Sequence, residues 1–322
     1  MHDNLLEVRD LEVVYKTDLE TVRAVNGVSL SLKKGKTLGI VGETGAGKTT
    51  TALSVMRLLP ARTGKILGGS VTFEGRDLLT LTEKEMLKVR GGKIAMIFQD
   101  PMTALNPVLT VGSQIAEALQ FHNTDNRTPQ QIQERVRETL ELVGIPASRA
   151  NQYPHQFSGG MKQRVVIAIA LACQPALLIA DEPTTALDVT IQAQVLALIQ
   201  TLQEQLDTSM MMITHDLGIV AQVCDDVCVM YAGEVVESGT AAEVFGAKAR
   251  HPYTEGLFGS IPGLASDAPR LKQIDGLMPD PTDLPSGCRF HPRCPRRMAA
   301  CAASVPPAVT EGTHTVRCHL FA

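Results

Sequence analysis

The sequence predicts an α/β fold followed by a loop-rich tail, and three observations lead to this prediction. Short apolar runs of strand composition alternate with amphipathic helical segments, as in a parallel sheet covered by helices. The glycine-rich run GETGAGKT stands between one such strand and one such helix. Ten of the chain's 18 prolines follow Arg250, a density that excludes long helices and strands from the tail.

The elements are predicted in order from the spacing of apolar residues. Strands are expected at residues 11–15, 28–32, 37–41 and 70–73, and a helix at 49–59. After a strand at 93–98, three helices are expected at 107–122, 129–145 and 158–172. Strands return at 176–181 and 210–215, separated by a helix at 190–206, and a hairpin follows at 227–232 and 234–239.

The change in composition near Arg250 predicts two domains. The first covers residues 1–250, with a helical subdomain at about 101–172, and the second is the proline-rich tail at 251–322. A net charge of only −4 without a basic block argues against nucleic acid as the main ligand. The amino terminus lacks the features of a secretory signal, and the longest apolar run, residues 165–173, is too short to cross a bilayer. We therefore expect any membrane role to depend on a partner.

GETGAGKT, residues 42–49, fits the motif G-x-x-x-x-G-K-[ST] in the strand–helix context that the motif requires, and is called the phosphate loop below. Its amides and the helix dipole favour phosphate, Lys48 reaches the β and γ phosphates, and Thr49 ligates Mg²⁺. A glycine-rich turn that binds nothing is the disfavoured alternative. The predicted ATP-binding residues here are Gly42, Glu43, Thr44, Gly45, Ala46, Gly47, Lys48, Thr49 and Thr50.

Two adjacent acids, Asp181 and Glu182, emerge at the carboxyl end of the apolar strand at 176–181, where α/β sheets bind ligands. Asp181 is suited to hold Mg²⁺ through water, and Glu182 is suited to polarise an attacking water as general base. The alternative is a pair of solvated acids that cap a strand. The phosphate loop upstream favours the catalytic interpretation.

A second glycine-rich helix start occurs in FSGGMKQR, where Ser158, Gly159 and Gly160 precede a helix. A serine N-cap and two glycines favour an anion at this end. Because the phosphate loop already holds one triphosphate, we predict that this start faces the nucleotide of another subunit. The stretch resembles the signature of the ATP-binding cassette (ABC) family, with Phe157 in place of the usual leucine.

The resemblance to the ABC family covers roughly residues 5–245 and assigns further roles. Gln99 of FQDP resembles the Q-loop glutamine, which also contacts Mg²⁺. Residues 185–188, TALD, resemble the D-loop, and His215 of ITHD resembles the switch histidine. The resemblance thus implies that Glu182, His215 and Gln99 are catalytic. Tyr15 stands where the family keeps an aromatic that stacks on adenine, although a tyrosine packed in the sheet is the plain alternative.

The family also implies a fold and an assembly. The fold would be a P-loop ABC ATPase cassette with a RecA-like core, an antiparallel β subdomain and a helical subdomain. One cassette per chain implies a pair, with each ATP between GETGAGKT of one subunit and SGGM of the other. ATP closes such a pair, and hydrolysis lets it reopen.

QDPMTALNP, MYAGEVVESG and RHPYTEGL resemble the ATPases of oligopeptide and dipeptide importers. This implies ATP-driven peptide import at the cytoplasmic face of the membrane. The implied partners are a second, related ATPase as heterodimer partner, two permease subunits and an extracytoplasmic peptide-binding protein, with no nucleic acid. Nickel importers share the subfamily, so nickel is the alternative cargo. An ABC ATPase of DNA or ribosomes is disfavoured because the chain has one cassette and no sustained heptads, and an exporter ATPase is disfavoured by the tail.

The tail carries four cysteines, Cys288, Cys294, Cys301 and Cys318. Disulfides are not expected inside a cell, so four cysteines in a tail short of apolar residues predict a metal staple. Five, six and sixteen residues separate successive cysteines, which leaves the metal open. The resemblance to peptide-importer ATPases favours a [4Fe-4S] cluster over zinc, with free thiols as the third possibility. The remaining cysteines, Cys173, Cys224 and Cys228, are predicted to be small buried hydrophobic residues.

Overall fold

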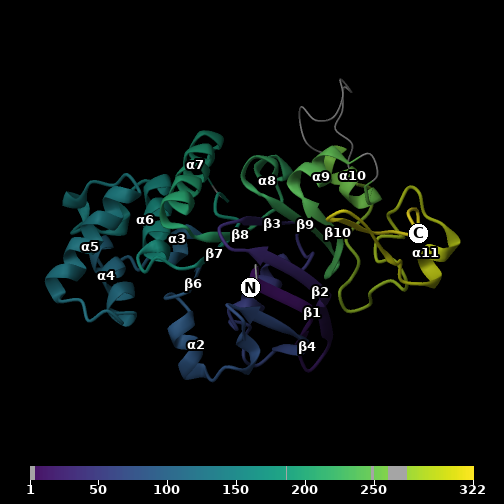
Figure 1. Ribbon diagram of the computed structural model, residues 1–322, viewed down its shortest axis with the longest axis horizontal. Coiled ribbons are helices and arrows are strands. Elements are labelled where there is room, and N and C mark those ends of the chain that lie inside the picture. Colours follow the sequence, from purple (N-terminus) through teal and green to yellow (C-terminus); the bar gives the residue numbers. More distant parts are fainter. Residues whose placement is uncertain (1–3, 186, 248–249, 260–273) are drawn as a thin grey trace. The chain divides into compact units, whose positions relative to one another are not determined.

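The computed structural model describes residues 4–185, 187–247, 250–259 and 274–322, with backbone only for residues 101 and 102. The chain divides into two compact units (Figure 1). The first consists of Met1–Thr80 and Met212–Ala322, and the second of Leu81–Met211. The phosphate loop and the cysteine tail therefore belong to one unit, although their sequence positions are far apart.

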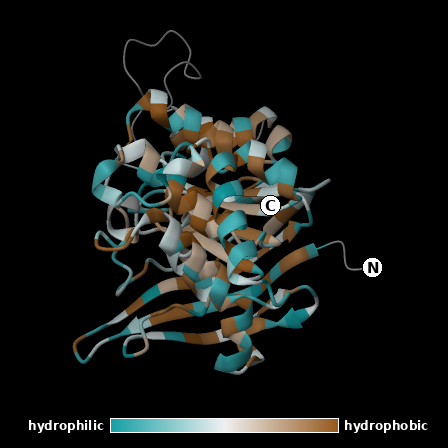
Figure 2. Cartoon of the chain, turned by 90° about the vertical axis from the view of Figure 1, so that its left-hand side faces the viewer, coloured by the Kyte–Doolittle hydropathy of each residue, from teal (hydrophilic) through white to brown (hydrophobic). Residues whose placement is uncertain are grey.

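An antiparallel sheet forms the amino-terminal part of the first unit, with strand order β2-β1-β4-β5. Side chains on the long strands β1 and β2 alternate between buried and exposed over much of their length, since one face of the sheet is packed and the other solvated. Figure 2 shows the corresponding alternation of hydropathy along these strands. The strands are β1 (Asn4–Lys16), β2 (Thr21–Lys33), β4 (Gly64–Phe73) and β5 (Arg76–Asp77).

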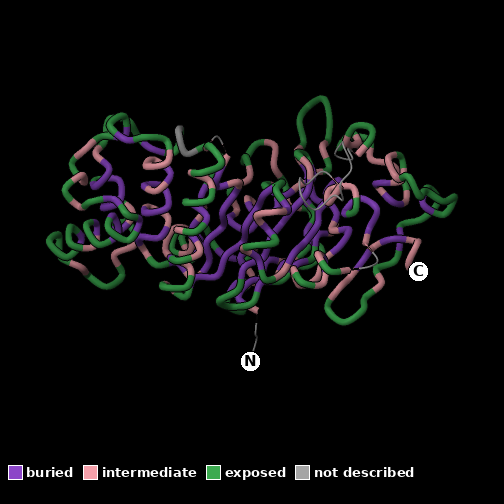
Figure 3. Tube along the Cα trace, turned by 90° about the horizontal axis from the view of Figure 1, so that it is seen from above, coloured by how far each residue is buried: buried purple, intermediate pink, exposed green. Residues whose placement is uncertain are grey.

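The first unit also contains strands in the order β11-β12-β10-β9-β3. The central pair, β3 (Thr37–Val41) and β9 (Asp226–Tyr231), is parallel and buried almost throughout, as the purple segments of Figure 3 indicate for the core. β3 leads directly into the phosphate loop, after which α1 (Lys48–Val55) begins. This helix ends four residues earlier than predicted, because the chain turns at Met56 and Arg57 adopts a positive φ of 50°.

The tail is built from short elements joined to the first unit. β10 (Glu234–Thr240) pairs with β12 (His314–Arg317), which pairs with β11 (Ala308–Glu311), so the tail extends the sheet that contains β10. Helices α10 (Pro252–Gly259) and α11 (Ala299–Ala303) are no longer than eight residues, as the proline density predicts. This unit also contains α8 (Leu217–Val223) and α9 (Ala241–Gly246).

The second unit is mostly helical. β6 (Ile94–Ile97) and β7 (Leu177–Asp181) run parallel, and β8 (Ser209–Thr214) carries the chain back into the first unit. Four helices begin with a side-chain cap from Thr110, Thr128, Ser158 or Asp188. They are α4 (Val111–Phe121), α5 (Pro129–Leu142), α6 (Gly159–Leu171) and α7 (Val189–Leu206).

Two further helices of this unit, α2 (Glu83–Val89) and α3 (Pro101–Ala104), were not predicted. The start of α2 is marked in the sequence by a capping box, in which Thr82 and Glu85 bond to each other's backbone amides. The segment is short, so its apolar periodicity is weak. The capping box is the stronger sequence signal for this helix. Among the described residues, no helix is long and apolar enough to cross a membrane.

Candidate ATP-binding and hydrolysis site

The phosphate loop has no room for a side chain at two of its glycines. Gly42 and Gly47 have φ values of 155° and 99°. A Cβ atom on Gly42 would lie 2.2 Å from the carbonyl oxygen of Met230, and one on Gly47 would lie 2.5 Å from that of Ala24. Neighbouring backbone therefore packs directly against the loop, and this close packing holds the loop in shape at the start of α1.

Lys48 is buried, with 6% of the residue exposed, and its charge is held within the loop. Its Nζ donates to the carbonyl oxygens of Gly42, at 2.7 Å, and Glu43, at 3.0 Å. The side chain thus bends back over the loop that it is predicted to serve. Thr49, the predicted Mg²⁺ ligand, is exposed at the first turn of α1, and Thr44 and Gly45 are exposed at the tip of the loop.

Tyr15 lies beside this helix start. The hydroxyl groups of Tyr15 and Thr50 are 3.2 Å apart and form a hydrogen bond. Tyr15 is half-buried on β1, so its ring is neither packed away in the sheet nor fully in solvent. The structure therefore brings together the predicted adenine-stacking residue and the predicted phosphate-binding segment.

The predicted catalytic acids lie in the second unit. Asp181 is the last residue of β7 and only 2% exposed. Glu182 follows with φ of 45°, a left-handed conformation that is rare for a residue with a side chain and concentrates at functional sites. Its Oε2 accepts hydrogen bonds from Gln99 Nε2 at 3.1 Å and from Thr185 Oγ1 at 2.9 Å. Two of the predicted catalytic residues, Gln99 and Glu182, are thus in direct contact.

The signature segment begins a helix as predicted. The hydroxyl of Ser158 accepts from the amide of Met161 at 3.4 Å, and Gly159 starts α6. Ser158 and Gly159 are exposed, and a Cβ on Gly160 would lie 2.7 Å from Ile191 Cγ2. The helix start is therefore open at its tip and tightly packed one residue later.

Sequence reasoning missed Gln163 in the same motif. This residue is fully buried on α6, and its Nε2 donates to the carbonyl oxygen of Pro183 at 2.6 Å. The contact ties the signature helix to the residue that follows Glu182. In the sequence Gln163 lies between Lys162 and Arg164, ahead of the apolar stretch of α6, so no local pattern marked it as buried.

His215, the predicted switch histidine, is exposed directly after β8, and the next residue, Asp216, caps α8 with its carboxylate. His215 and the phosphate loop belong to the first unit, whereas Gln99, Ser158, Asp181 and Glu182 belong to the second. The predicted D-loop at residues 185–188 includes Ala186, which lies outside the described residues.

The four tail cysteines share one environment. None of them forms a disulfide, and Cys288, Cys301 and Cys318 are buried while Cys294 is half-buried. Burial, together with the neighbouring thiols Cys301, Cys318 and Cys294, raises the pKa of the Cys288 thiol to about 11. In Cys288, Cys294 and Cys318, the pKa is partly lowered again by a hydrogen bond from the backbone amide two residues later, at Phe290, Arg296 and Leu320.

The predicted metal site is not supported by the geometry. Within the described part of the chain, no group of three or more His, Cys, Asp or Glu side chains is arranged to hold a metal ion. Cys224 and Cys228 are buried as predicted, and burial raises the pKa of each thiol to about 12. Cys173 is only half-buried, and its Sγ lies 3.6 Å from the carbonyl oxygen of Ala118.

The fold and these segments define the class of protein. The solved structure of the dimeric ABC transporter cassette MJ0796 is 29% identical, covers 73% of this chain and 98% of its own, and superposes with a TM-score of 0.65. The same cassette bound to ADP and Pi gives the same TM-score at 28% identity. A family model described as ABC transporter matches residues 25–185. The α/β cassette fold predicted from the sequence is therefore confirmed, and the chain is an ABC ATPase.

The branch of the family follows from the tail and from the relatives. The model "Oligopeptide/dipeptide transporter, C-terminal region" matches residues 236–301. The dipeptide transport ATP-binding protein DppD of Bacillus subtilis is 51% identical over 99% of this chain and 95% of its own length. The oligopeptide transport ATP-binding protein OppD of Escherichia coli is 49% identical over 94% of this chain and 89% of its own. The chain belongs to the oligopeptide/dipeptide family of ABC transporter ATP-binding proteins.

Proposed function

We propose that this chain hydrolyses Mg-ATP to power the import of dipeptides or oligopeptides through a membrane transporter. The observation that carries the proposal is the match of the tail to the oligopeptide/dipeptide transporter region. Relatives named as dipeptide and oligopeptide transport proteins match nearly the whole chain, cassette and tail together. Nickel is the alternative cargo of the same machine. An ABC ATPase of DNA or ribosomes has no observation in its favour.

The proposed chemistry divides between the two glycine-rich segments and the two acids. The phosphate loop holds the triphosphate, with Lys48 on the β and γ phosphates and Thr49, Gln99 and Asp181 on Mg²⁺. Gln99 and Thr185 donate hydrogen bonds to the carboxylate of Glu182 and orient it. Glu182 then accepts the proton of the attacking water. His215 assists from the end of β8. Bound Mg²⁺ would neutralise part of the phosphate charge. The residues named here would position the triphosphate and the water and transfer the proton.

The proposed assembly is a pair of cassettes on a membrane partner. The open start of α6 at Ser158 and Gly159 is proposed to contact the ATP held by the phosphate loop of a second, related ATPase. The pair would bind two permease subunits at the cytoplasmic face of the membrane, supplied by an extracytoplasmic peptide-binding protein. ATP can drive transport only through its higher affinity for the closed pair.

Uptake by cells that lack this gene tests the cargo. We expect labelled di- or oligopeptide uptake to be lost, to return with the parent gene and to stay absent with the Lys48→Ala gene, while labelled nickel uptake is unchanged throughout. The Lys48→Ala strain controls for effects of the protein's presence alone. Intact peptide uptake together with lost nickel uptake would replace the proposed cargo by nickel.

We also propose that Cys288, Cys294, Cys301 and Cys318 hold a structural metal centre, a [4Fe-4S] cluster in preference to zinc. Support comes from the donor set, which is four thiols without a disulfide. It also comes from the backbone amides two residues after Cys288, Cys294 and Cys318, which offset part of the rise that burial causes in the pKa of these thiols. Among the described residues, no three His, Cys, Asp or Glu side chains are arranged as metal ligands, which argues against the metal centre. Electron transfer is not required for ATP-driven transport, so the role would be to staple the tail.

Anaerobic purification tests the metal centre. We expect a brown protein with a broad absorbance near ~400 nm, and we expect replacement of any of the four cysteines by serine to remove the colour. Cys224→Ser is the matched control, because this buried thiol lies outside the tail and should leave the colour unchanged. A colourless protein with one zinc per chain would exclude iron and sulfur but keep the staple, and four thiols that react freely in the folded protein would exclude both.

A further inference from the structure

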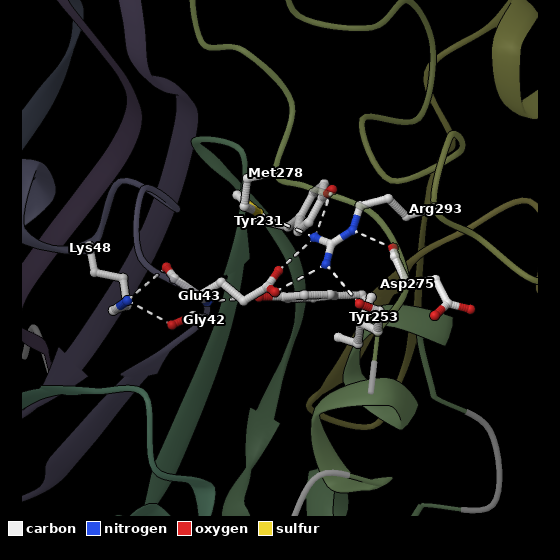
Figure 4. Close-up of polar contacts among 9 residues, drawn as sticks. Gly42, Glu43, Lys48, Tyr231, Tyr253, Asp275, Met278 and Arg293 are labelled. Carbon is white, nitrogen blue, oxygen red and sulfur yellow. Dashed lines mark hydrogen bonds and ion pairs between the residues drawn. The ribbon is translucent and has the colours of Figure 1, made fainter. Parts of the chain in front are cut away.

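The tail contacts the phosphate loop through a two-pronged ion pair between Arg293 and Glu43 (Figure 4). Arg293 Nη1 lies 2.7 Å from Glu43 Oε2, and Nη2 lies 3.1 Å from Oε1. The Arg293 side chain is 5% exposed and that of Glu43 is 30% exposed. This bidentate, largely desolvated geometry distinguishes the pair from ordinary surface ion pairs, which contribute little.

Arg293 is held in place by the tail and by Tyr231 of β9. Its Nε donates to the carbonyl oxygen of Asp275 at 2.9 Å, and its guanidinium carbon lies 5.8 Å from the ring centroid of Tyr231. Nη2 also lies 3.4 Å from the carbonyl oxygen of Ile274. These contacts fix the guanidinium independently of Glu43. Formation of the ion pair therefore costs less side-chain entropy than a pair between two free side chains.

A second tail residue holds the backbone of the same loop residue. The amide of Glu43 donates to the hydroxyl of Tyr253 on α10 at 2.8 Å. Tyr253 is fully buried, and its ring contacts those of Tyr231 and Phe290 at centroid distances of 4.6 and 5.4 Å. Tyr253 belongs to the RHPYTEGL stretch that the sequence analysis used only as a family resemblance. The tail thus forms an ion pair with the side chain of Glu43 and a hydrogen bond with its backbone amide.

Glu43 connects these contacts to the lysine that is predicted to bind phosphate. Its carbonyl oxygen accepts from Lys48 Nζ at 3.0 Å, as Figure 4 shows. Glu43 also brings a carboxylate into a loop that must accept a highly charged anion. A like charge in the same site weakens binding of the anion unless a neighbouring cation neutralises it.

We propose that Arg293 is a positioning residue for ATP, which neutralises the carboxylate of Glu43 and orients the phosphate loop from the tail. The inference rests on the binding of ATP by this loop. It gives the tail a role in the ATPase cycle beyond its own stability. Tyr253 supports the same arrangement through the amide of Glu43.

Arg293→Ala tests the proposal in the full chain and in the assembled transporter. We expect the KM for ATP, and the Kd of a fluorescent ATP analogue, to rise by at least about fivefold, with kcat at saturating ATP close to that of the parent. The double variant Glu43→Gln with Arg293→Ala should have a lower KM than Arg293→Ala alone, because the repelling carboxylate is gone. Loss of tail structure alone would not be reversed by a change in the loop.

Arg289→Ala is the matched control. Arg289 also joins the tail to the cassette, with Nε 3.3 Å from Glu234 Oε1, but its pair does not touch the phosphate loop. We expect its KM for ATP to equal that of the parent. Should Arg293→Ala fail to fold, as judged by its melting curve, Arg293→Met keeps the packing against Tyr231 and serves the same comparison.

Three outcomes would overturn the inference. They are a parental KM in folded Arg293→Ala, an equal rise in Arg289→Ala, and a folded double variant that stays as impaired as Arg293→Ala. A parent protein that does not bind the ATP analogue at all would instead contradict the assignment of the phosphate loop. The two failures are therefore distinguishable.

Discussion

Glu182→Gln is expected to reduce ATP turnover by about 10²- to 10⁴-fold, the range that a general base contributes, while ATP binding stays close to that of the parent. The amide cannot accept the proton of the attacking water. Its oxygen can still accept from Gln99 and Thr185, which now bond to the carboxylate, so the local structure should persist. Turnover in the assembled transporter and the Kd of an ATP analogue measure the two effects separately.

The same variant should accumulate as the proposed ATP-bound pair, because this pair is expected to close on binding ATP and to reopen after hydrolysis. Size-exclusion chromatography with and without ATP, in the presence of the partner ATPase, measures this. Glu204→Gln is the matched control, since this exposed glutamate of α7 is in the same unit and far along the chain from the predicted site. Parental turnover in Glu182→Gln would show that another group is the base.

Lys48→Ala is expected to weaken ATP binding by about 10- to 100-fold, the loss of one charged hydrogen-bonding group from a binding site. Lys48 is buried in the loop, and its ammonium is already held at 2.7 and 3.0 Å by two carbonyl oxygens of the loop. Its charge is therefore positioned before ATP arrives. The Kd of an ATP analogue for the full chain measures the effect.

The control for this variant is Lys36→Ala. Lys36 lies just before β3 in the same unit, and it pairs at 2.7 Å with Asp225 on the surface, where its side chain is 51% exposed. A surface pair of this kind contributes little, so the Kd should be unchanged. Equal losses in both variants would mean that general positive charge, not Lys48, governs binding.

The helical block and the α/β strands were predictable because their signals are periodic and long. The segments at 107–122, 129–145 and 158–172 contain α4, α5 and α6, and the strand at 37–41 is β3 at the predicted bounds. Short elements were not predictable in this way. Helix α2 was missed because its seven residues carry too little apolar periodicity. The predicted domain boundary near Arg250 remains a prediction, and the compact unit that contains the tail also contains residues 1–80.

The roles predicted for Gln99, Ser158, Asp181, Glu182 and His215 remain predictions, although the contact between Gln99 and Glu182 supports two of them. Sequence patterns could identify these residues because each lies next to a glycine-rich turn or at the end of a strand, positions that are visible in the sequence. The metal centre is the weakest of the predictions from the sequence. Its four cysteines are spaced too irregularly to define a ligand geometry, and the described residues do not arrange three of them as ligands.

The sequence by itself determined the class of the protein, because the phosphate loop, the acids after β7 and the signature are each local patterns whose chemistry is contained in a few consecutive residues. Only the tertiary structure showed that the tail contacts the phosphate loop. Arg293 and Glu43 are 250 positions apart, and Tyr253 and Glu43 are 210 apart, so no spacing rule connects them. Their contact arises because β12 pairs with β10 and aromatic rings pack Tyr253 against Tyr231 and Phe290, which places the tail against the loop after β3. Packing of this kind depends on the whole fold, whereas a phosphate-binding turn depends on its own backbone.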